Sequence, residues 1–262
     1  MDQDRVPHLT PRSLVGQRFA PDVFGGIWVA LLGYCPPPAQ LERYRPQRVT
    51  DQHFIHVSPE SVRILQHGGQ RFLSLAHVYG GPVSASTVEE LAYYGIDVIL
   101  SYGLAGGLGT KRLAMGDFYL VEDARAFDGT TPHYTGERIV AADSGLRERI
   151  LGDWPGRIVP VRAATGDAIY REDDAMLDRF RAEGCDIVNL DSSHLFAVSR
   201  TNSEGRTIRT IQCGVVSDVA GPGAESESTL STMLSGSGEG FNPLEKTGDI
   251  VRFYIEDLAP KL

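Results

Sequence analysis

The sequence is poor in cysteine and has no long apolar run. Its three cysteines, Cys35, Cys185 and Cys213, are widely spaced and odd in number, which argues against a disulfide framework or a zinc knuckle and indicates a reducing compartment. No apolar run approaches the roughly 18 residues that cross a bilayer, and the charged N-terminus lacks the apolar core of a signal peptide. We therefore expect a soluble cytoplasmic protein that does not contact membranes.

Clusters of basic residues are also missing. The 262-residue chain has 25 Lys and Arg against 34 Asp and Glu, a formal charge of −9 and a pI near 5.3. A surface that binds nucleic acid is therefore not expected. Hydrophobic residues make up 42% of the chain, which is enough for a large core and excludes a mainly disordered protein.

Apolar runs alternate with segments of helical spacing along the chain. The pattern predicts buried strands at 26–32, 97–100, 118–121, 186–190 and 207–216, a hairpin at 62–65 and 71–78, and helices at 84–94, 173–183, 192–201 and 243–258. This alternation predicts an α/β fold, a single domain of three α/β/α layers with a mixed central sheet. We expect residues 1–25 to be an N-terminal extension and 26–262 to be the domain. The Ser/Gly-rich stretch Gly221–Gly240 predicts a mobile loop, and whether it closes as a lid stays open.

Two glycine-rich segments follow predicted strands. Residues 80–86 precede a helix, whose start offers free N–H groups to a ligand, although a purely structural turn is the alternative. Residues 103–108 form a predicted turn at the carboxyl end of a strand, where open α/β sheets place their ligands. The spacing is G-x-x-G-G rather than G-x-G-x-x-G, so a dinucleotide cofactor is not expected.

Two aspartates stand at the ends of apolar strands. Asp191 is poorly placed for a core unless it meets donors such as sugar hydroxyls, or it caps the helix that begins at Ser192. Asp218, at the end of Gly214-Val-Val-Ser-Asp218, would suit a general acid if burial raised its pKa, and a cap or turn is the alternative.

Familiar catalytic and metal motifs are absent. The sequence contains no G-x-S-x-G, H-E-x-x-H or Walker loop. A single H-x-x-H pair, His53 and His56, predicts a surface or packing pair rather than a metal site. We expect no metal and no organic cofactor.

Taken in order, the segments resemble the nucleoside phosphorylase superfamily, which includes uridine and purine nucleoside phosphorylases and methylthioadenosine/adenosylhomocysteine nucleosidases. The similarity runs from about Trp28 to Val219. The matching segments are 79–86 (G-G-P-S-A-S), 103–108 with 115–117 (G-T-A-G-G-L and V-G-D), 127–134 (D-E/G-T-S-x-H-Y), 165–170 (S-x-D-x-F-Y), 189–191 (E-M-E) and 216–218 (V-S-D).

The resemblance implies cleavage or formation of the N-glycosidic bond of a purine-type nucleoside. Asp218 would be the catalytic acid at purine N7, and Leu190 and Asp191 would contact the ribose, with Asp191 in place of the usual Glu. A carboxylic acid at the leaving group and negative charge near the sugar both stabilise an oxocarbenium-like transition state. The residues implied around the base are Ile169, Tyr170 and Gly106. The family also implies a homo-oligomer, between a dimer and a hexamer.

The acceptor side departs from the family pattern. The implied acceptor-side residues are Gly33, Ser101, Gly103 and Leu104, and the sequence has Ser101 and Leu104 where phosphorylases carry an Arg and a Thr. A phosphate would lose charge-assisted hydrogen bonds worth about 1.5–3 kcal/mol each, yet the water-activating Glu of the nucleosidases would fall among prolines 36–38. Phosphate as a co-substrate and water therefore both stay open. A catalytically silent nucleoside-binding or scaffold protein and a divergent biosynthetic enzyme on the same fold are the alternatives.

Overall fold

The computed structural model describes residues 7–220 and 242–262. The loop expected at Gly221–Gly240 lies outside the described residues. None of the described helices is long and apolar enough to span a bilayer.

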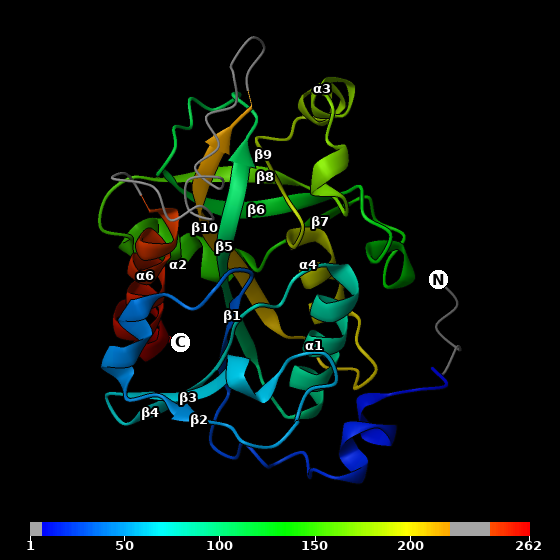
Figure 1. Cartoon of the computed structure of the whole chain (residues 1–262), viewed down its shortest axis with the longest axis vertical. Helices are drawn as coiled ribbons and strands as arrows, with labels where there is room; N and C mark the ends of the chain where they lie inside the picture. The colour runs from blue at the N-terminus through cyan, green and yellow to red at the C-terminus, as the bar shows by residue number, and fades with distance from the viewer. Residues whose placement is uncertain (1–6, 221–241) are drawn as a thin grey trace.

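A mixed ten-stranded sheet runs through the described part of the chain (Figure 1). Its strands are β1 (Val29–Gly33), β2 (Gln47–Arg48), β3 (Val62–His67), β4 (Gln70–Leu75), β5 (Val98–Gly107), β6 (Phe118–Ala126), β7 (Ile139–Ala141), β8 (Ile158–Thr165), β9 (Ile187–Asn189) and β10 (Arg209–Val219). The order is β10-β6-β8-β9-β5-β1-β4-β3-β2, with β7 beside β6. Because β10 also pairs with β5, strands β10, β6, β8, β9 and β5 close into a ring.

Helices cover both faces of the sheet (Figure 1). Helices α1 (Gly81–Tyr93) and α4 (Ser192–Arg200) lie together on one face, and α2 (Ser144–Asp153) and α6 (Pro243–Phe253) lie on the other. Helix α3 (Asp174–Ala182) packs outside β8 and β9, and α6 continues into a π-helical turn, Tyr254–Leu258.

Strand β1 explains why three layers form. Ala30 and Leu32 belong to the buried cluster under α1 and α4, whereas Val29 and Leu31 belong to the cluster under α2 and α6. All four side chains are fully buried, so successive residues pack on opposite faces and the strand needs apolar residues at every position. The predicted three-layer α/β/α architecture with a mixed sheet is confirmed.

Several element boundaries differ from the prediction. Residues 103–107 belong to β5 and do not form a turn, and β10 continues through Asp218 to Val219, because these two stretches pair with each other. Strands β2, β7 and β8 and helix α2 were not predicted. The hairpin is confirmed as β3 and β4, and α1 begins at Gly81 rather than Ser84.

The N-terminal segment packs against the sheet and α1. Val15 and Phe24 are buried in the main apolar cluster, and the Tyr93 hydroxyl donates a hydrogen bond to the Phe19 carbonyl (2.9 Å). The domain boundary at residues 25 and 26 stays a prediction.

Candidate active site

Strand β5 has an interrupted edge near the middle of the sheet. β1 pairs with β5 through Val98–Tyr102, and β9 pairs with it through Gly106 and Gly107. None of the described strands therefore pairs with residues 103–105 on that edge, and we call this interruption the β5 gap. It lies at the carboxyl ends of β1 and β9, a position where α/β sheets bind ligands.

Glycine at position 103 lets three side chains approach the gap. A Cβ atom there would lie 3.2 Å from Tyr34 Cβ, 3.7 Å from Gln212 Nε2 and 3.8 Å from Asp191 Oδ2. Any larger residue would push these groups apart. The structure thus brings the predicted sugar residue Asp191 to the predicted acceptor-side residue Gly103.

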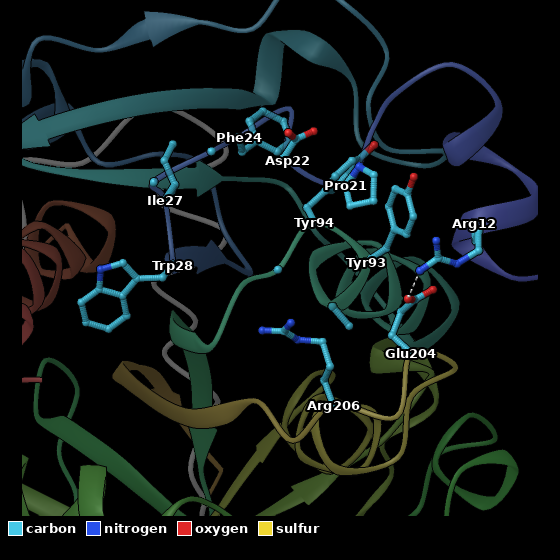
Figure 2. Close-up of a pocket in the computed structure, with 14 residues that line it drawn as sticks. Arg12, Pro21, Asp22, Phe24, Ile27, Trp28, Tyr93, Tyr94, Glu204 and Arg206 are labelled. Atoms are coloured by element: carbon cyan, nitrogen blue, oxygen red, sulfur yellow. Dashed lines mark hydrogen bonds and ion pairs between the residues drawn. The ribbon is translucent and has the colours of Figure 1, made fainter.

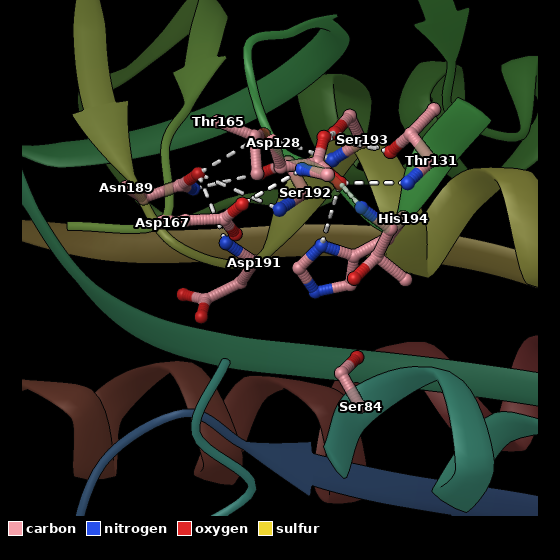
Figure 3. A network of polar contacts seen from close by, with 12 residues as sticks. Ser84, Asp128, Thr131, Thr165, Asp167, Asn189, Asp191, Ser192, Ser193 and His194 are labelled. Atoms are coloured by element: carbon pink, nitrogen blue, oxygen red, sulfur yellow. Dashed lines mark hydrogen bonds and ion pairs between the residues drawn. The ribbon is translucent and has the colours of Figure 1, made fainter. Parts of the chain in front are cut away.

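The carboxyl group of Asp191 is buried without a cation. Burial raises its pKa well above the usual value, and contact with the Gln212 amide opposes this only in part; no Lys or Arg of the described chain contributes. Asp191 is the N-cap residue of α4, but its side chain makes no capping hydrogen bond. In Figure 3 the carboxylate points away from the polar network behind it, on the side where Ser84 lies. The helix-cap alternative is therefore wrong for the Asp191 side chain.

Tyr34 fills the space beside Asp191. Its side chain is 5% exposed, and its hydroxyl is 2.6 Å from Ser84 Oγ on the first turns of α1. Burial, and then the charge of Asp191, raise the pKa of the phenol well above its usual value. Tyr34 is therefore a neutral phenol at physiological pH.

Asp218 approaches the gap from the other face of β5. A β-bulge shifts the register of β10 between Val216 and Asp218, and the Ser217 hydroxyl donates to Asp218 Oδ1 at 2.6 Å. A Cβ atom on Gly106 would lie 3.1 Å from Asp218 Oδ2. Asp218 lies within a strand, so the cap-or-turn alternative is wrong. Because Gly103 and Gly106 are three residues apart, their open sides face opposite ways and lie about 10 Å apart along the strand.

The loop after β8 contributes an acidic residue but does not enclose a base. Burial, and then the charge of Asp218, raise the pKa of Glu172 to about 7. Ile169 and Tyr170, on a single turn that projects from the end of β8, are 47% and 96% exposed. The structure therefore leaves the two predicted base-packing side chains largely in solvent.

The remaining predicted site residues serve the packing of the strands. Leu190 is partly buried beside Asp191. The Ser101 hydroxyl donates to the Ile211 carbonyl (2.9 Å), and Leu104 packs on the cluster under α2 and α6. A Cβ on Gly33 would lie 2.6 Å from the Tyr102 hydroxyl, so only glycine fits there.

A polar network lies behind Asp191 and is centred on Asp128 (Figure 3). Asp128 accepts hydrogen bonds from the backbone of Thr130 (2.9 Å) and Thr131 (2.7 Å) and from the hydroxyls of Thr131 (2.8 Å) and Ser193 (2.6 Å). His194 Nδ1 lies 3.8 Å from Asp128 Oδ1. Although burial acts in the opposite direction, the nearby His194 imidazole and the hydrogen bonds from Ser193 and Thr131 hold the pKa of Asp128 well below its usual value.

The two larger cavities described lie elsewhere on the chain. One of about 470 Å³ lies at the amino ends of the strands, between Trp28, Tyr94 and Arg206 (Figure 2), at the opposite edge from the β5 gap. The other, of about 900 Å³, is lined by the start of α1, by the N-terminal segment and by Thr130. Gly81 lies between this larger cavity and His194. Neither cavity is lined by Asp191 or Asp218.

Among the described residues no group of three potential metal ligands occurs. His53 is buried, with its ring stacked 4.0 Å from that of Phe19, and His56 is exposed. The interpretation of His53 as a packing residue is confirmed.

Comparison with known proteins identifies the family. The sequence profile of the Phosphorylase superfamily matches residues 28–237. The chain belongs to this superfamily. "Uncharacterized protein R802" of Acanthamoeba polyphaga mimivirus is 32% identical over 195 residues, which cover 73% of this chain and 76% of that protein.

Solved structures of the phosphorylase superfamily share the fold. The 5′-methylthioadenosine/S-adenosyl homocysteine nucleosidase of Campylobacter jejuni has a TM-score of 0.68 at 17% identity, covering 90% of this chain and all of that one. The purine nucleoside phosphorylase of Toxoplasma gondii, in complex with immucillin-H, has a TM-score of 0.64 at 18% identity, covering 100% and 98%. The expected nucleoside phosphorylase-like fold, and an enzyme of this superfamily, are thereby confirmed.

In this phosphorylase-superfamily chain, sequence reasoning missed several residues around the gap. They are Tyr34, Ser84, Asp128, Glu172, His194 and Gln212. Tyr34 follows a strand end and Asp128 lies in the segment 127–134, so their positions offered a signal. Gln212 and His194 lie within a strand and a helix, where nothing distinguishes them from ordinary packing residues.

Proposed function

We propose that this protein breaks the N-glycosidic bond of a purine-type nucleoside bound across the β5 gap. Asp191 hydrogen-bonds the ribose hydroxyls, and Asp218 protonates the leaving base. The proposal rests on one observation above all. A buried carboxyl group without a cation lies on one face of the gap, and a second carboxyl group lies on the other face, near the same three-residue interruption.

The sugar side is argued from unpaired polar groups. A buried carboxyl group with too few donors is costly, and ribose hydroxyls are donors that would reduce this cost. The Tyr119 hydroxyl is also buried and has no hydrogen-bond partner among the described residues. It lies against Gly214, which pairs with Gly103. A neutral, hydroxyl-rich ligand suits these groups.

The base side is argued from the pair of carboxyl groups. Burial and the charge of Asp218 raise the pKa of Glu172 to about 7, so Glu172 holds a proton beside Asp218 about half of the time near neutral pH. A leaving base needs such a proton as the bond to C1′ breaks. The preference for a purine follows from the resemblance of Val216-Ser-Asp218 to the family's V-S-D, because N7 of a purine can accept the proton.

Assembly and location are further parts of the proposal. We expect a homo-oligomer in the cytoplasm. Leu9 and Ile55 are 62% and 44% exposed beside the larger cavity, and a second copy of the chain would cover such apolar side chains. Light scattering measures the number of subunits.

The test is release of free base from a panel of purine and pyrimidine nucleosides. Asp218→Asn should slow release about 10²- to 10⁴-fold, because an amide cannot donate the proton that a general acid supplies. Asp178→Asn, at an exposed ion pair with Arg181, is the matched control and should keep wild-type turnover. Unchanged turnover in Asp218→Asn would show that Asp218 is not the acid. Tight nucleoside binding in calorimetry without any product would favour the silent binding protein.

A further inference from the structure

The groups that surround Asp191 share one electrostatic property. Tyr34, Cys35 and Tyr119 are all buried near it, and burial raises the pKa of each. The charge of Asp191 raises the pKa of all three further, and no Lys or Arg of the described chain lowers any of them. This side of the β5 gap therefore disfavours negative charge.

The imidazole of His194 does not change this picture. Its Nδ1 faces Asp128 Oδ1 at 3.8 Å, so any positive charge on the ring is matched by that carboxylate. A phosphate dianion at the gap would lose its hydration and gain no counter-charge there, and an uncompensated buried charge is among the most costly groups in a protein.

Tyr34 also removes the space that an oxyanion would need. The phenol extends from the end of β1 to the first turns of α1, where its hydroxyl meets Ser84 Oγ at 2.6 Å. Two backbone hydrogen bonds fix the start of its loop, because the Tyr34 N–H donates to Tyr102 O (2.9 Å) and Val78 N–H donates to Gly33 O (3.2 Å). The ring therefore occupies the space between Gly103 and Ser84, on the side of the gap where Asp191 lies.

We infer that the acceptor in this site is water and that Tyr34 is the residue that excludes phosphate. The inference rests on the proposed function. The water oxygen forms a bond to C1′ as the C1′–N bond breaks, and the electron pair of that bond leaves with the base. The base takes its proton from Asp218, and the proton lost by the water restores Asp218 through solvent. The products are a free sugar and a free base.

The first experiment follows base release in ¹⁸O-labelled water, without phosphate and with increasing inorganic phosphate, at ionic strength held constant with sodium chloride. We expect the rate to change less than about twofold, and the sugar to carry one solvent oxygen. A sugar 1-phosphate product, or stimulation by phosphate of about tenfold or more, would overturn the inference while leaving glycosidic cleavage intact.

The second experiment does not depend on turnover. Inorganic phosphate is titrated against the unliganded protein and followed by calorimetry and by the ³¹P line width. Wild type and Tyr34→Phe, which keeps the ring, should show no saturable binding in the low millimolar range. Tyr34→Ala should bind phosphate at least about tenfold more tightly, because loss of the ring opens the space between Gly103 and the Ser84 hydroxyl to the anion.

The outcomes separate the two proposals. Saturable binding of phosphate to the wild type overturns the inference even if no nucleoside is cleaved, and an unresponsive, folded Tyr34→Ala overturns the role of Tyr34. Absence of base release across the nucleoside panel overturns the proposed function instead. If Tyr34→Ala does not fold, as judged by circular dichroism, the wild-type titration and the labelled-water experiment still decide.

Discussion

Two buried aspartates at the start of α4 have opposite environments: Asp191 directly precedes the helix, and Asp128 contacts Ser193 in its first turn. Asp128 accepts four hydrogen bonds from Thr130, Thr131 and Ser193, and these hold its pKa low although burial opposes them. Asp191 has no such set of donors, and burial raises its pKa. Asp128 is therefore a carboxylate whose hydrogen-bond donors come from the protein, whereas Asp191 is a buried carboxyl group with few protein donors.

The difference separates structural from functional carboxylates. Proteins normally pair buried polar groups internally, so a group left without partners is a place where a ligand can supply them. The Asp128 network joins the segment after β6 to the start of α4 and thereby fixes the backbone that carries Asp191. In this comparison Asp128 stabilises the backbone around Asp191, and Asp191 is the carboxyl group that we propose binds the substrate.

The largest expected effect comes from substituting Asp128, the aspartate with the larger set of hydrogen bonds. Asp128→Ala removes the acceptor of four hydrogen bonds and should lower the free energy of unfolding by about 3–5 kcal/mol. Because the pKa of Asp128 is lowered on folding, its contribution is present above the unfolded pKa and is lost as pH falls. Urea unfolding at pH 7, and then stepwise from about pH 5 to about pH 2, measures both features.

The control for Asp128→Ala is Asp143→Ala. Asp143 caps α2 with a single hydrogen bond to the Leu146 N–H (2.8 Å), so its loss should cost only about 1 kcal/mol. Equal losses in the two variants would show that the Asp128 network is no stronger than an ordinary helix cap.

The sequence identified the positions of the two gap carboxylates, because Asp191 and Asp218 each end an apolar strand. It also predicted the layers, since the alternation of strands and helices fixes them. The β5 gap could not be predicted, because it depends on where β1 stops and β9 starts along β5. The contact of Tyr34 with Ser84, 50 residues away, follows only once those strand ends are placed.

The differences between predicted and observed element boundaries also have physical causes. Gly103 and Gly106 look like turn residues, yet in β5 they admit side chains from neighbouring strands. β8 was missed because Pro160 and Arg162 interrupt its apolar pattern. Pairing with β6 on one side and β9 on the other overrides that local composition.

The second prediction removes the unsatisfied charge. Asp191→Asn should raise the free energy of unfolding by about 1–3 kcal/mol at pH 8, because a buried neutral amide replaces a carboxylate that has no cation. The pKa of Asp191 is raised on folding, so the free energy of unfolding of the wild type falls as pH rises above the unfolded pKa of this group. The variant has no such titration, and the difference between variant and wild type should therefore grow with pH. Thermal unfolding from pH 5 to pH 8 measures it.

The same substitution should impair base release, which distinguishes a functional group from a merely destabilising one. Asp178→Asn, at an exposed ion pair, is the control and should change neither quantity. A loss of stability in Asp191→Asn at every pH would mean that the carboxylate is satisfied in the folded protein, and the contrast with Asp128 would disappear.

The smallest expected effect concerns a third buried carboxylate, far from the gap. Glu90 on α1 is 2% exposed. Its Oε1 accepts a hydrogen bond from the Ile55 N–H at 2.9 Å, and its Oε2 has no partner among the described residues. Burial raises its pKa to about 7, although the bond from Ile55 acts in the opposite direction. Glu90 is thus intermediate between Asp128 and Asp191.

Glu90→Gln keeps the acceptor for Ile55 and removes the charge. Because the folded pKa is raised, the wild type loses stability between about pH 4.5 and pH 7, so the variant should be more stable by about 1–2 kcal/mol at pH 8 and equal to wild type near pH 4. Glu148→Gln, on the exposed side of α2, should show no such pH dependence. Base release should stay at the wild-type rate in Glu90→Gln, because Glu90 does not reach the β5 gap. A pH-independent difference between Glu90→Gln and wild type would mean that the carboxyl group is solvated, and that burial without donors is not what distinguishes these three acids.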